Sequence, residues 1–283
     1  MRVSVVQLCP NSDKAANIAR ARLAIEACVE RDRPGLVVLP EVWTCLGGTR
    51  EEKFTAAEVL PRPGDAEDGG EAYRFLREMA VRHRVTVHGG SIAELSGDRL
   101  CNTSLVFGPD GRELGRYSKI HLFDVTTPNG DGYRESETYR AGDRCSVVRI
   151  DAGDGREIGL GLAICYDLRF PELFLRLRRE GAELVALPAA FTAETGAAHW
   201  EALLRARAIE TQCWFAASGT TGRHRDGQGA ARDTWGHSMV VDPWGTVVAA
   251  AGTGEGWATG WMDAGLTERV RTGIPVLAHR RLA

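Results

Sequence analysis

The chain has 283 residues, 43% of them hydrophobic, and its 35 basic and 38 acidic side chains give a formal net charge of -3. This length and composition allow a large buried core, and the balanced charge argues against nucleic acid and anionic membranes as partners. The longest apolar runs are strand-sized, far below the roughly 20 residues of a membrane span. The apolar part of Met1 to Pro10 is too short for a signal peptide. We therefore expect a soluble cytoplasmic protein.

The seven cysteines and seven histidines follow no ligand or disulfide pattern. The number of cysteines is odd, and the sequence contains no C-x-x-C pair and no H-x-x-x-H spacing. Disulfide frameworks and structural zinc sites depend on such paired spacings. We therefore expect no bound metal and no cofactor.

The N-terminal segment predicts a strand, an amphipathic helix and a second strand that ends at a carboxylate. Val3–Leu8 is rich in β-branched residues, and Lys14–Val29 has apolar residues at helical spacing after Asp13, a good N-cap residue. The apolar run Leu36–Leu39 then stops at a proline. Glu41 follows directly, at the exit edge of a buried strand, although most glutamates lie in solvated loops.

The next segment predicts a helix and three strands, the last of which ends at a lysine. The expected elements are a glycine-rich connection over Gly64–Gly70, a helix over Glu71–Arg84, and strands over Val85–Ile92, Leu100–Phe107 and Glu113–Ile120. Gly108–Gly111 provides a hairpin turn between the last two strands. Lysines are normally exposed, but Lys119 stands between Tyr117 and Ile120, which favours burial.

A long irregular segment, Pro128–Ala141, leads to the central stretch of the chain. Loops of this length in compact domains are commonly functional, and this one carries two glutamates. A hairpin of Cys145–Ile150 and Glu157–Ile164 follows and runs into Cys165, and a helix over Pro171–Glu180 begins at its proline. Cys165 thus lies where ligands bind in open α/β sheets, near a helix start that favours thiolate. It is either a nucleophile or a small core residue.

The C-terminal part repeats the outline of the N-terminal part. The expected elements are strands over Glu183–Phe191, Cys213–Ser218, His237–Val241, Val247–Ala251 and Trp257–Met262, a helix over Ala197–Thr211, and a polar loop over Thr220–Trp235. The first of these strands repeats the order of apolar run, Leu-Pro and small or aromatic residues seen in Leu36–Trp43. Because no linker or charge shift divides the chain, we expect one α/β domain with two similarly built sheets.

Three residues share one property, which is that each ends a hydrophobic strand. They are Glu41, Lys119 and Cys165. A carboxylate that takes the thiol proton, a thiolate that attacks a carbonyl or nitrile carbon, and an ammonium that stabilises the tetrahedral oxygen are sufficient for acyl transfer. The ammonium also stabilises the thiolate by its opposite charge.

At these residues the sequence resembles the nitrilase superfamily of carbon–nitrogen hydrolases. The resemblance runs over nearly the whole chain and rests on three motifs in order, Leu39-Pro40-Glu41, Tyr117-Ser118-Lys119-Ile120-His121-Leu122 and Ala163 to Glu172. It implies a four-layer αββα sandwich of two mixed sheets flanked by helices, formed as a single domain by residues 1–283. It also implies a Glu-Lys-Cys triad, with Glu135 as a second glutamate near it, whereas the neighbours of Glu137 match less well.

Within this superfamily, Ala190–Glu201 and Trp235–Gly245 look like the branch of deaminated-glutathione amidase and ω-amidase. That branch implies a thiol amidohydrolase that cleaves the terminal amide of a small carboxylate-bearing substrate, such as deaminated glutathione or an α-keto ω-amide, to acid plus ammonia through a thioester. Arg169 and Thr195 match carboxylate-binding positions, with Phe191 beside the substrate and the Tyr166 N–H as an oxyanion donor. Members commonly form homodimers or larger homo-oligomers.

Other functions remain open at this point. The same triad suits a nitrilase or an N-carbamoyl amino acid amidohydrolase, and a catalytically silent binding protein has the same fold. A Cys-His hydrolase would need His199 or His237 beside Cys165. A serine hydrolase and a nucleotide-binding protein are disfavoured, because the chain lacks G-x-S-x-G, a phosphate-binding loop and a full G-x-G-x-x-G.

Overall fold

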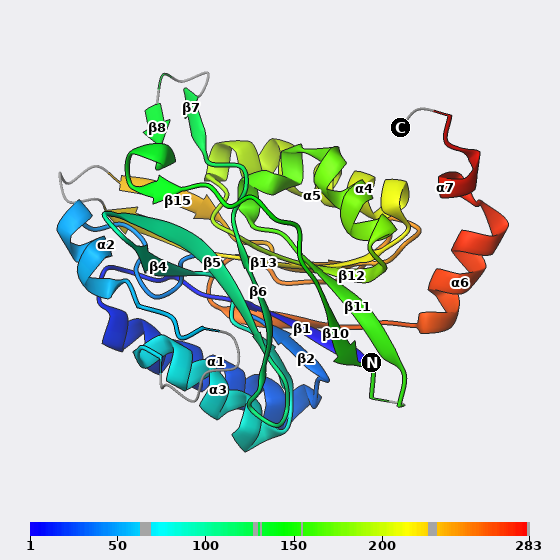
Figure 1. Cartoon of the computed structure of the whole chain (residues 1–283), viewed down its shortest axis with the longest axis horizontal. Helices are drawn as coiled ribbons and strands as arrows, with labels where there is room; N and C mark the ends of the chain where they lie inside the picture. The colour runs from blue at the N-terminus through cyan, green and yellow to red at the C-terminus, as the bar shows by residue number, and fades with distance from the viewer. Residues whose placement is uncertain (63–68, 127–129, 131, 154, 226–230, 282–283) are drawn as a thin grey trace.

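The computed structural model describes residues 1–62, 69–126, 130, 132–153, 155–225 and 231–281. Two mixed β-sheets pack against each other, and helices cover both outer faces (Figure 1). This is the four-layer αββα sandwich expected from the sequence.

The first sheet is centred on three parallel strands, β1 (Arg2–Gln7), β2 (Leu36–Val38) and β3 (Thr86–His88). Its order is β18-β1-β2-β3-β5-β4, and β6 and β9 also pair with β5. The added strands are β4 (Ile92–Ser96), β5 (Arg99–Phe107), β6 (Glu113–Ser118), β9 (Tyr139–Arg140) and β18 (Gly256–Trp261). Their pairings are antiparallel except that between β5 and β9.

The second sheet has the same plan, with parallel strands at its centre and antiparallel strands outside. Its order is β10-β11-β12-β13-β16-β17. The strands are β10 (Val147–Asp151), β11 (Glu157–Leu162), β12 (Ala182–Ala189), β13 (Trp214–Gly219), β16 (Met239–Val241) and β17 (Val247–Ala250). The sequence repeat around the two Leu-Pro pairs therefore corresponds to one central strand in each sheet, β2 and β12.

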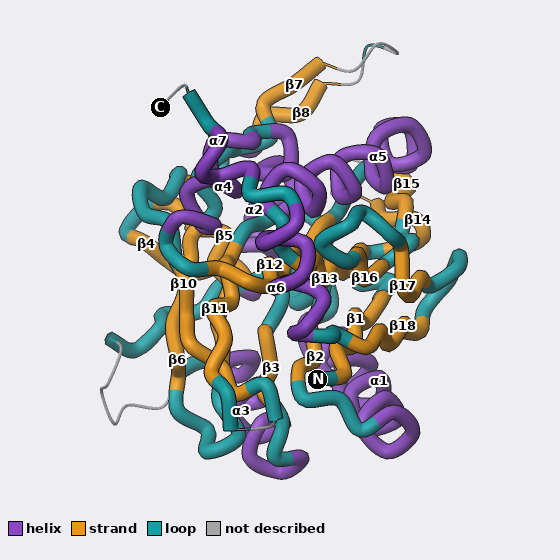
Figure 2. Tube along the Cα trace, turned by 90° about the vertical axis from the view of Figure 1, so that its right-hand side faces the viewer, coloured by secondary structure: helices purple, strands orange, loops and turns teal. Residues whose placement is uncertain are grey.

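Two long helices cover each outer face. α1 (Lys14–Asp32) and α3 (Glu71–His83) lie on the first sheet, and α4 (Pro171–Arg179) and α5 (Ala193–Thr211) lie on the second (Figure 1). The predicted N-cap of α1 is confirmed, because the Asp13 carboxylate accepts a hydrogen bond from the Ala16 N–H at 3.0 Å. α6 (Ala264–Gly273) and α7 (Val276–His279) lie at one end of the sandwich, and α6 faces the viewer in Figure 2. No described helix is long and apolar enough to cross a membrane.

Side-chain alternation along the strands divides the core into two layers. Val3 and Val5 of β1 face the second sheet and join the core between the sheets, whereas Val6 joins the core beneath α1 and α3. Because successive side chains of a strand point to opposite faces, a strand covered on both sides buries nearly all of its side chains. This explains the apolar run of β2, whereas the buried polar side chains of Ser4 and Gln7 in β1 are hydrogen-bonded.

The structure corrects several expected boundaries. Val85–Ile92 is not one strand, because a turn at Gly89–Ser91 separates β3 from β4. Thr220–Trp235 is not simply a loop: β14 (Thr221–Arg225) and β15 (Ala231–Trp235) pair as antiparallel strands. Residues 226–230 between them, and 63–68 of the expected glycine-rich connection, lie outside the described part.

The hydrophobic pattern of the sequence also does not predict several short polar helices and strands. α2 (Arg50–Ala56) has one buried residue and begins with a capping box of Thr49 and Glu52, which was a readable signal. α6 and α7 were not expected. The segment expected to be irregular contains β8 (Gly132–Arg134), paired with β7 (Asp124–Thr126), and the 3-10 helix η1 (Glu135–Glu137). Residues 127–129 and 131 of that region are not described.

Candidate active site

Glu41 lies in a tight turn just after β2. The following residue, Val42, has a φ of 40°, an unusual conformation for a β-branched residue. Ser91 holds this turn by donating its N–H to the Pro40 carbonyl at 3.1 Å and by accepting the Val42 N–H on its hydroxyl at 3.0 Å. A Cβ on Gly90 would lie 2.0 Å from the Pro40 oxygen, so this contact requires glycine. The β3–β4 turn therefore fixes the direction of the Glu41 side chain.

Lys119 is the first residue after β6, and its side chain is buried between two carboxylates. The Lys119 Nζ lies 3.0 Å from Glu41 Oε1 and 2.8 Å from Glu135 Oε2. Glu135 opens η1, and its Oε2 also accepts the Phe123 N–H at 2.7 Å. The structure thus joins three segments that are distant in sequence. Glu137 is exposed and forms no hydrogen bond or ion pair with the described residues.

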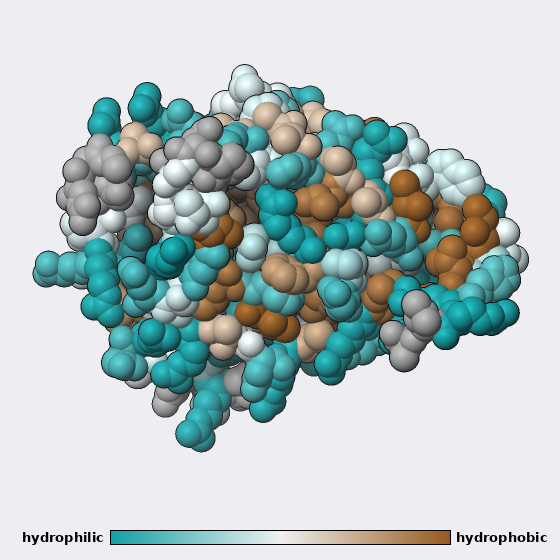
Figure 3. Space-filling view, turned by 90° about the horizontal axis from the view of Figure 1, so that it is seen from above, coloured by the Kyte–Doolittle hydropathy of each residue, from teal (hydrophilic) through white to brown (hydrophobic). Residues whose placement is uncertain are grey.

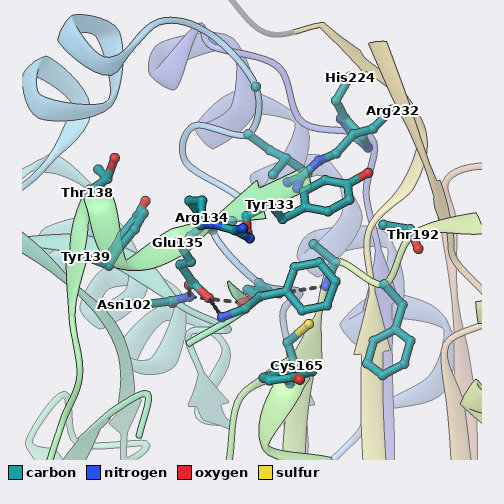
Figure 4. A pocket seen from close by; sticks show the side chains of 18 of the residues that line it. Asn102, Tyr133, Arg134, Glu135, Thr138, Tyr139, Cys165, Thr192, His224 and Arg232 are labelled. Carbon is teal, nitrogen blue, oxygen red and sulfur yellow. Dashed lines mark hydrogen bonds between the residues drawn. The ribbon is translucent and has the colours of Figure 1, made fainter. Parts of the chain in front are cut away.

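Cys165 does not end the strand itself, as the sequence suggested. β11 stops at Leu162, and Cys165 begins the 3-10 helix η2 (Cys165–Arg169) with a φ of 47°. Such left-handed backbone in a residue other than glycine is strained and is found preferentially at functional sites. The turn presents the sulfur at the floor of a cavity (Figure 4).

Asp167, fully buried, links this turn to the segment that carries Lys119. Its Oδ2 accepts the Tyr117 hydroxyl at 2.7 Å and the Ile164 N–H at 2.8 Å. Its Oδ1 lies 3.1 Å from the His121 backbone nitrogen and 2.7 Å from the His121 Nδ1. Two of these partners flank Lys119 in sequence, and one immediately precedes Cys165. One carboxylate therefore fixes the relative positions of the amine and the sulfur.

The buried ammonium is strongly stabilised in its charged form. Burial alone lowers the pKa of Lys119, but the adjacent Glu135 and Glu41 carboxylates outweigh burial, so the pKa lies well above its usual value. The charged form of Lys119 is therefore favoured, and an ammonium at this position is suited to stabilising a developing negative charge.

The state of the thiol corrects one sequence-based expectation. Burial raises the pKa of Cys165 well above its usual value, the Glu41 carboxylate raises it further, and Lys119 lowers it by less. The nearby helix start and the lysine therefore do not hold a thiolate at rest. A neutral thiol next to a carboxylate is the arrangement in which the carboxylate can take the proton during reaction.

Asn102, in β5, is a site residue that sequence reasoning missed. Its side-chain amide donates to Glu41 Oε1 at 2.9 Å and to Glu135 Oε1 at 3.3 Å, and its backbone carbonyl accepts the Lys119 N–H at 2.9 Å. The Glu41 Oε2 accepts the N–H of Ala190, just after β12, at 2.8 Å. Asparagines in strands carry no distinctive spacing, so only the way β5, the turn after β2 and η1 come together reveals this contact.

These groups line a cavity of about 710 Å³. It is open to solvent, and its wall includes Glu41, Asn102, Lys119, Glu135 and Cys165. Figure 4 shows Cys165 at one end, with Tyr133, Arg134, His224 and Arg232 toward the other. A cavity of this size matches those that bind small organic ligands.

The four residues expected to bind substrate also line the cavity. Arg169 is half-buried, with its guanidinium 5.5 Å from the Phe191 ring centroid and 6.0 Å from that of Tyr166, and its Nη2 is 3.3 Å from the His199 Nδ1. Thr195 lies in the first turn of α5, where its hydroxyl is 2.8 Å from that of Thr192.

The histidines proposed for a Cys-His mechanism do not line the described cavity. His199 contacts Arg169, and His237 stacks on Trp235 with ring centroids 4.1 Å apart. Within the described residues, no group of three or more His, Cys, Asp or Glu side chains is placed to hold a metal ion.

Comparison with known proteins identifies the family of the chain. The family model described as carbon-nitrogen hydrolase matches residues 2–272. The chain is 38% identical over 280 residues to the deaminated glutathione amidase of Synechocystis sp., covering 98% of this chain and 97% of that protein. It is also 38% identical over 280 residues to the chloroplastic omega-amidase of Arabidopsis thaliana, covering 99% of this chain and 72% of that protein.

A solved structure gives the same result for the fold. The crystal structure of Saccharomyces cerevisiae Nit3, described as a member of branch 10 of the nitrilase superfamily, aligns with a TM-score of 0.84 and 32% identity. The alignment covers 100% of this chain and 97% of that one.

Proposed function

Because the chain belongs to the carbon–nitrogen hydrolase family, a family of hydrolases that act on non-peptide C–N bonds, we propose that Cys165 is its nucleophile and Glu41 its general base. The observation that carries this proposal is the contact of Lys119 with both Glu41 and Glu135 at the wall of the cavity that Cys165 lines. We assign Glu135 the role of holding the ammonium in place.

In the first half-reaction, Glu41 takes the proton of the Cys165 thiol as the sulfur attacks the amide carbon. The carbonyl oxygen becomes an oxyanion, which accepts hydrogen bonds from the Lys119 ammonium and the backbone N–H of Tyr166. This N–H lies in the first turn of η2, where N–H groups lack partners within the helix. When the C–N bond breaks, the proton held by Glu41 passes to the leaving amine, and a thioester remains.

The second half-reaction returns the enzyme to its starting state. Glu41 takes a proton from a water molecule, whose oxygen attacks the thioester carbon. Lys119 and the Tyr166 N–H stabilise the oxyanion again. When the C–S bond breaks, the carboxylic acid is released and the Cys165 sulfur recovers a proton from Glu41. One water is consumed, and one acid and one amine are formed.

We propose amides of small carboxylate-bearing acids as substrates, with deaminated glutathione and α-keto ω-amides as the leading examples. The names of the Synechocystis and Arabidopsis relatives support this class. We assign the carboxylate-bearing acyl part to Arg169, Thr195 and Phe191, and their position in the cavity wall supports this assignment. The amine released differs between the two examples: it is ammonia from an ω-amide and cysteinylglycine from deaminated glutathione.

A panel of substrates tests the proposal. Product release is measured with ω-amides, deaminated glutathione, N-carbamoyl amino acids and nitriles, using wild-type protein and Cys165→Ala. We expect turnover of the carboxylate-bearing amides by wild type and its loss in the variant, with the circular dichroism spectrum unchanged. Equal turnover by the two proteins would falsify the assignment of the nucleophile.

We also propose that residues 1–283 form one carbon–nitrogen hydrolase domain, which works in the cytoplasm as a homodimer or larger homo-oligomer. Exposed apolar side chains support the assembly: Ile209, Trp244, Trp261 and Ile274 are 52%, 59%, 63% and 47% exposed. Figure 3 shows further apolar side chains at the end of the molecule where α6 and α7 lie. The free state of all seven cysteines supports a reducing compartment.

A further inference from the structure

Beyond the buried cluster of Glu41, Lys119 and Glu135, the cavity wall has an excess of positive charge. The remaining described lining residues include four cations, Lys53, Arg134, Arg169 and Arg232, and one carboxylate, that of Glu137. The whole chain has a net charge of -3, so this excess is local. A cavity lined by one sign of charge concentrates ligands of the opposite sign.

Two of these cations already have contacts that account for their positions. Arg134 donates to the carbonyls of Val125 and Tyr133 at 3.2 and 2.9 Å, and its charge lowers the pKa of Asp124. Arg169 lies beside Phe191 and is assigned above to the acyl part of the substrate.

No contact of this kind accounts for the position of Arg232, in β15. It is half-buried and forms no hydrogen bond or salt bridge within the described part of the chain. The titratable group that feels the Arg232 charge in the cavity wall is not an acid but His224, whose pKa is lowered chiefly by burial and also by Arg232. The two ring nitrogens of His224 already have partners, because Nδ1 lies 2.8 Å from the Pro10 carbonyl oxygen and Nε2 lies 2.8 Å from the Thr234 hydroxyl. A guanidinium that loses hydration without a carboxylate partner is costly, unless a ligand supplies the anion.

The two arginines reach the cavity from different elements. Arg169 lies four residues after Cys165 in the same 3-10 helix, whereas Arg232 enters from the β14–β15 hairpin. Figure 4 shows Arg232 at the end of the cavity away from the Cys165 sulfur. When the acyl part of an amide occupies the side of Arg169, with its carbonyl carbon at the sulfur, the amine part extends toward Arg232.

We propose that Arg232 is a second anion subsite, which binds a carboxylate on the leaving amine. The inference rests on the proposed function and specifies its substrate class: amides that carry one carboxylate on the acyl part and another on the amine part. A guanidinium suits this role because it offers paired donors to both carboxylate oxygens. The volume of about 710 Å³ fits such an extended substrate, whereas a small keto-acid amide fills only part of it.

The test compares three substrates that share one acyl group. They are α-ketoglutaramate, deaminated glutathione, and deaminated glutathione with its C-terminal carboxylate converted to a carboxamide. The measured quantity is the ratio of kcat/KM for deaminated glutathione to kcat/KM for each of the other two. Arg232→Gln is compared with wild type and with Arg223→Gln, a control on the same hairpin whose exposed side chain faces Asp233 at 3.9 Å.

We expect Arg232→Gln to lower both ratios at least tenfold, mainly through KM, and Arg223→Gln to leave them as in wild type. Arg232→Lys, which keeps the charge, should recover part of the loss. Ratios unchanged in Arg232→Gln would overturn the subsite.

A binding measurement decides the question independently of turnover. In the Cys165→Ala background, calorimetry with deaminated glutathione should give at least a tenfold weaker dissociation constant when Arg232→Gln is added. The carboxamide form should bind both proteins equally. If wild type turns over none of the three substrates, the proposed function fails, while equal binding of deaminated glutathione by the two proteins refutes the subsite.

Discussion

At the scale of single residues, the site combines a lysine and a cysteine whose pKa values are both raised. Two carboxylates hold the Lys119 ammonium, and burial together with Glu41 raises the pKa of Cys165. A permanently buried thiolate would cost desolvation energy in every resting molecule. With a neutral thiol, the sulfur loses its proton to Glu41 only when the substrate is bound. The negative charge that then develops on the substrate oxygen is stabilised at once by the oxyanion donors.

A titration of the thiol tests this arrangement. The ultraviolet absorbance of thiolate is measured against pH for wild type and for Cys165→Ser. Subtracting the second curve from the first removes the contribution of the other six cysteines. We expect no difference signal below about pH 8.5, the usual value for cysteine, and a rise only at higher pH. A thiolate signal at neutral pH that disappears in Cys165→Ser would show that Lys119 outweighs burial and Glu41.

At the scale of secondary structure elements, the catalytic groups depend on connections between segments rather than on any one segment. Asp167 joins η2 to the end of β6, and Ser91 joins the β3–β4 turn to the turn after β2. Each connection uses backbone N–H groups that the irregular turns leave without partners in regular structure. The polar residues at these positions are therefore structural supports for the reacting groups.

Asp167→Asn tests the link between η2 and β6. The substituted amide keeps the shape of the side chain, but its NH₂ group must face either the Ile164 N–H or the His121 N–H. A buried N–H group that faces another donor has no acceptor, which lowers the free energy of unfolding by about 1–3 kcal/mol. We therefore expect a lower melting temperature together with a reduced kcat.

Tyr117→Phe is the matched control, because it removes one donor to Asp167 and leaves the carboxylate in place. It should cost about 1 kcal/mol of stability and reduce kcat by less than Asp167→Asn. If the two variants lose kcat equally, the charge on Asp167 has no special role in positioning the catalytic groups.

At the scale of the whole molecule, the two sheets and four covering helices share cores that connect distant parts of the chain. β1, near the N-terminus, pairs with β18, near the C-terminus, and its side chains enter both core clusters. A buried group in this framework therefore influences the stability of the entire fold. His88, in β3, is such a group, with a fully buried side chain whose Nδ1 accepts the Gly90 N–H at 3.2 Å.

We expect the buried His88 side chain to make the stability of the folded protein sensitive to acid. Burial lowers the pKa of His88 to about 3, below the value of about 6.5 in the unfolded chain. The folded state thus binds this proton less readily, and the stability contribution is complete above pH 6.5 and is lost as the pH falls toward 3. Each pH unit within that window costs up to about 1.4 kcal/mol.

Urea unfolding at a series of pH values, for wild type and His88→Asn, measures this effect. Asparagine keeps an acceptor near the position of Nδ1 but does not titrate. We expect the variant to be less stable near neutral pH and to lose stability less steeply between pH 6.5 and 3. Parallel curves for the two proteins would exclude His88 as a source of acid sensitivity.

The sequence by itself determined the central strands, the long helices and the location of Glu41, Lys119 and Cys165 in the segments that follow strands. This was possible because burial on both faces imposes apolar runs, and because helix caps and hairpin turns depend on residues close in sequence. The family resemblance added the layer order and Glu135, which no local pattern indicates.

Only the tertiary structure decided which polar groups meet and in what state. The contact of Asn102 with both glutamates depends on how β5, the turn after β2 and η1 come together, and the Asp167 link depends on how the two sheets pack. The neutral thiol of Cys165 is a balance between burial and charges contributed by other segments. Such distances and desolvation costs arise from residues far apart in the chain, so the spacing of residues within one segment does not encode them.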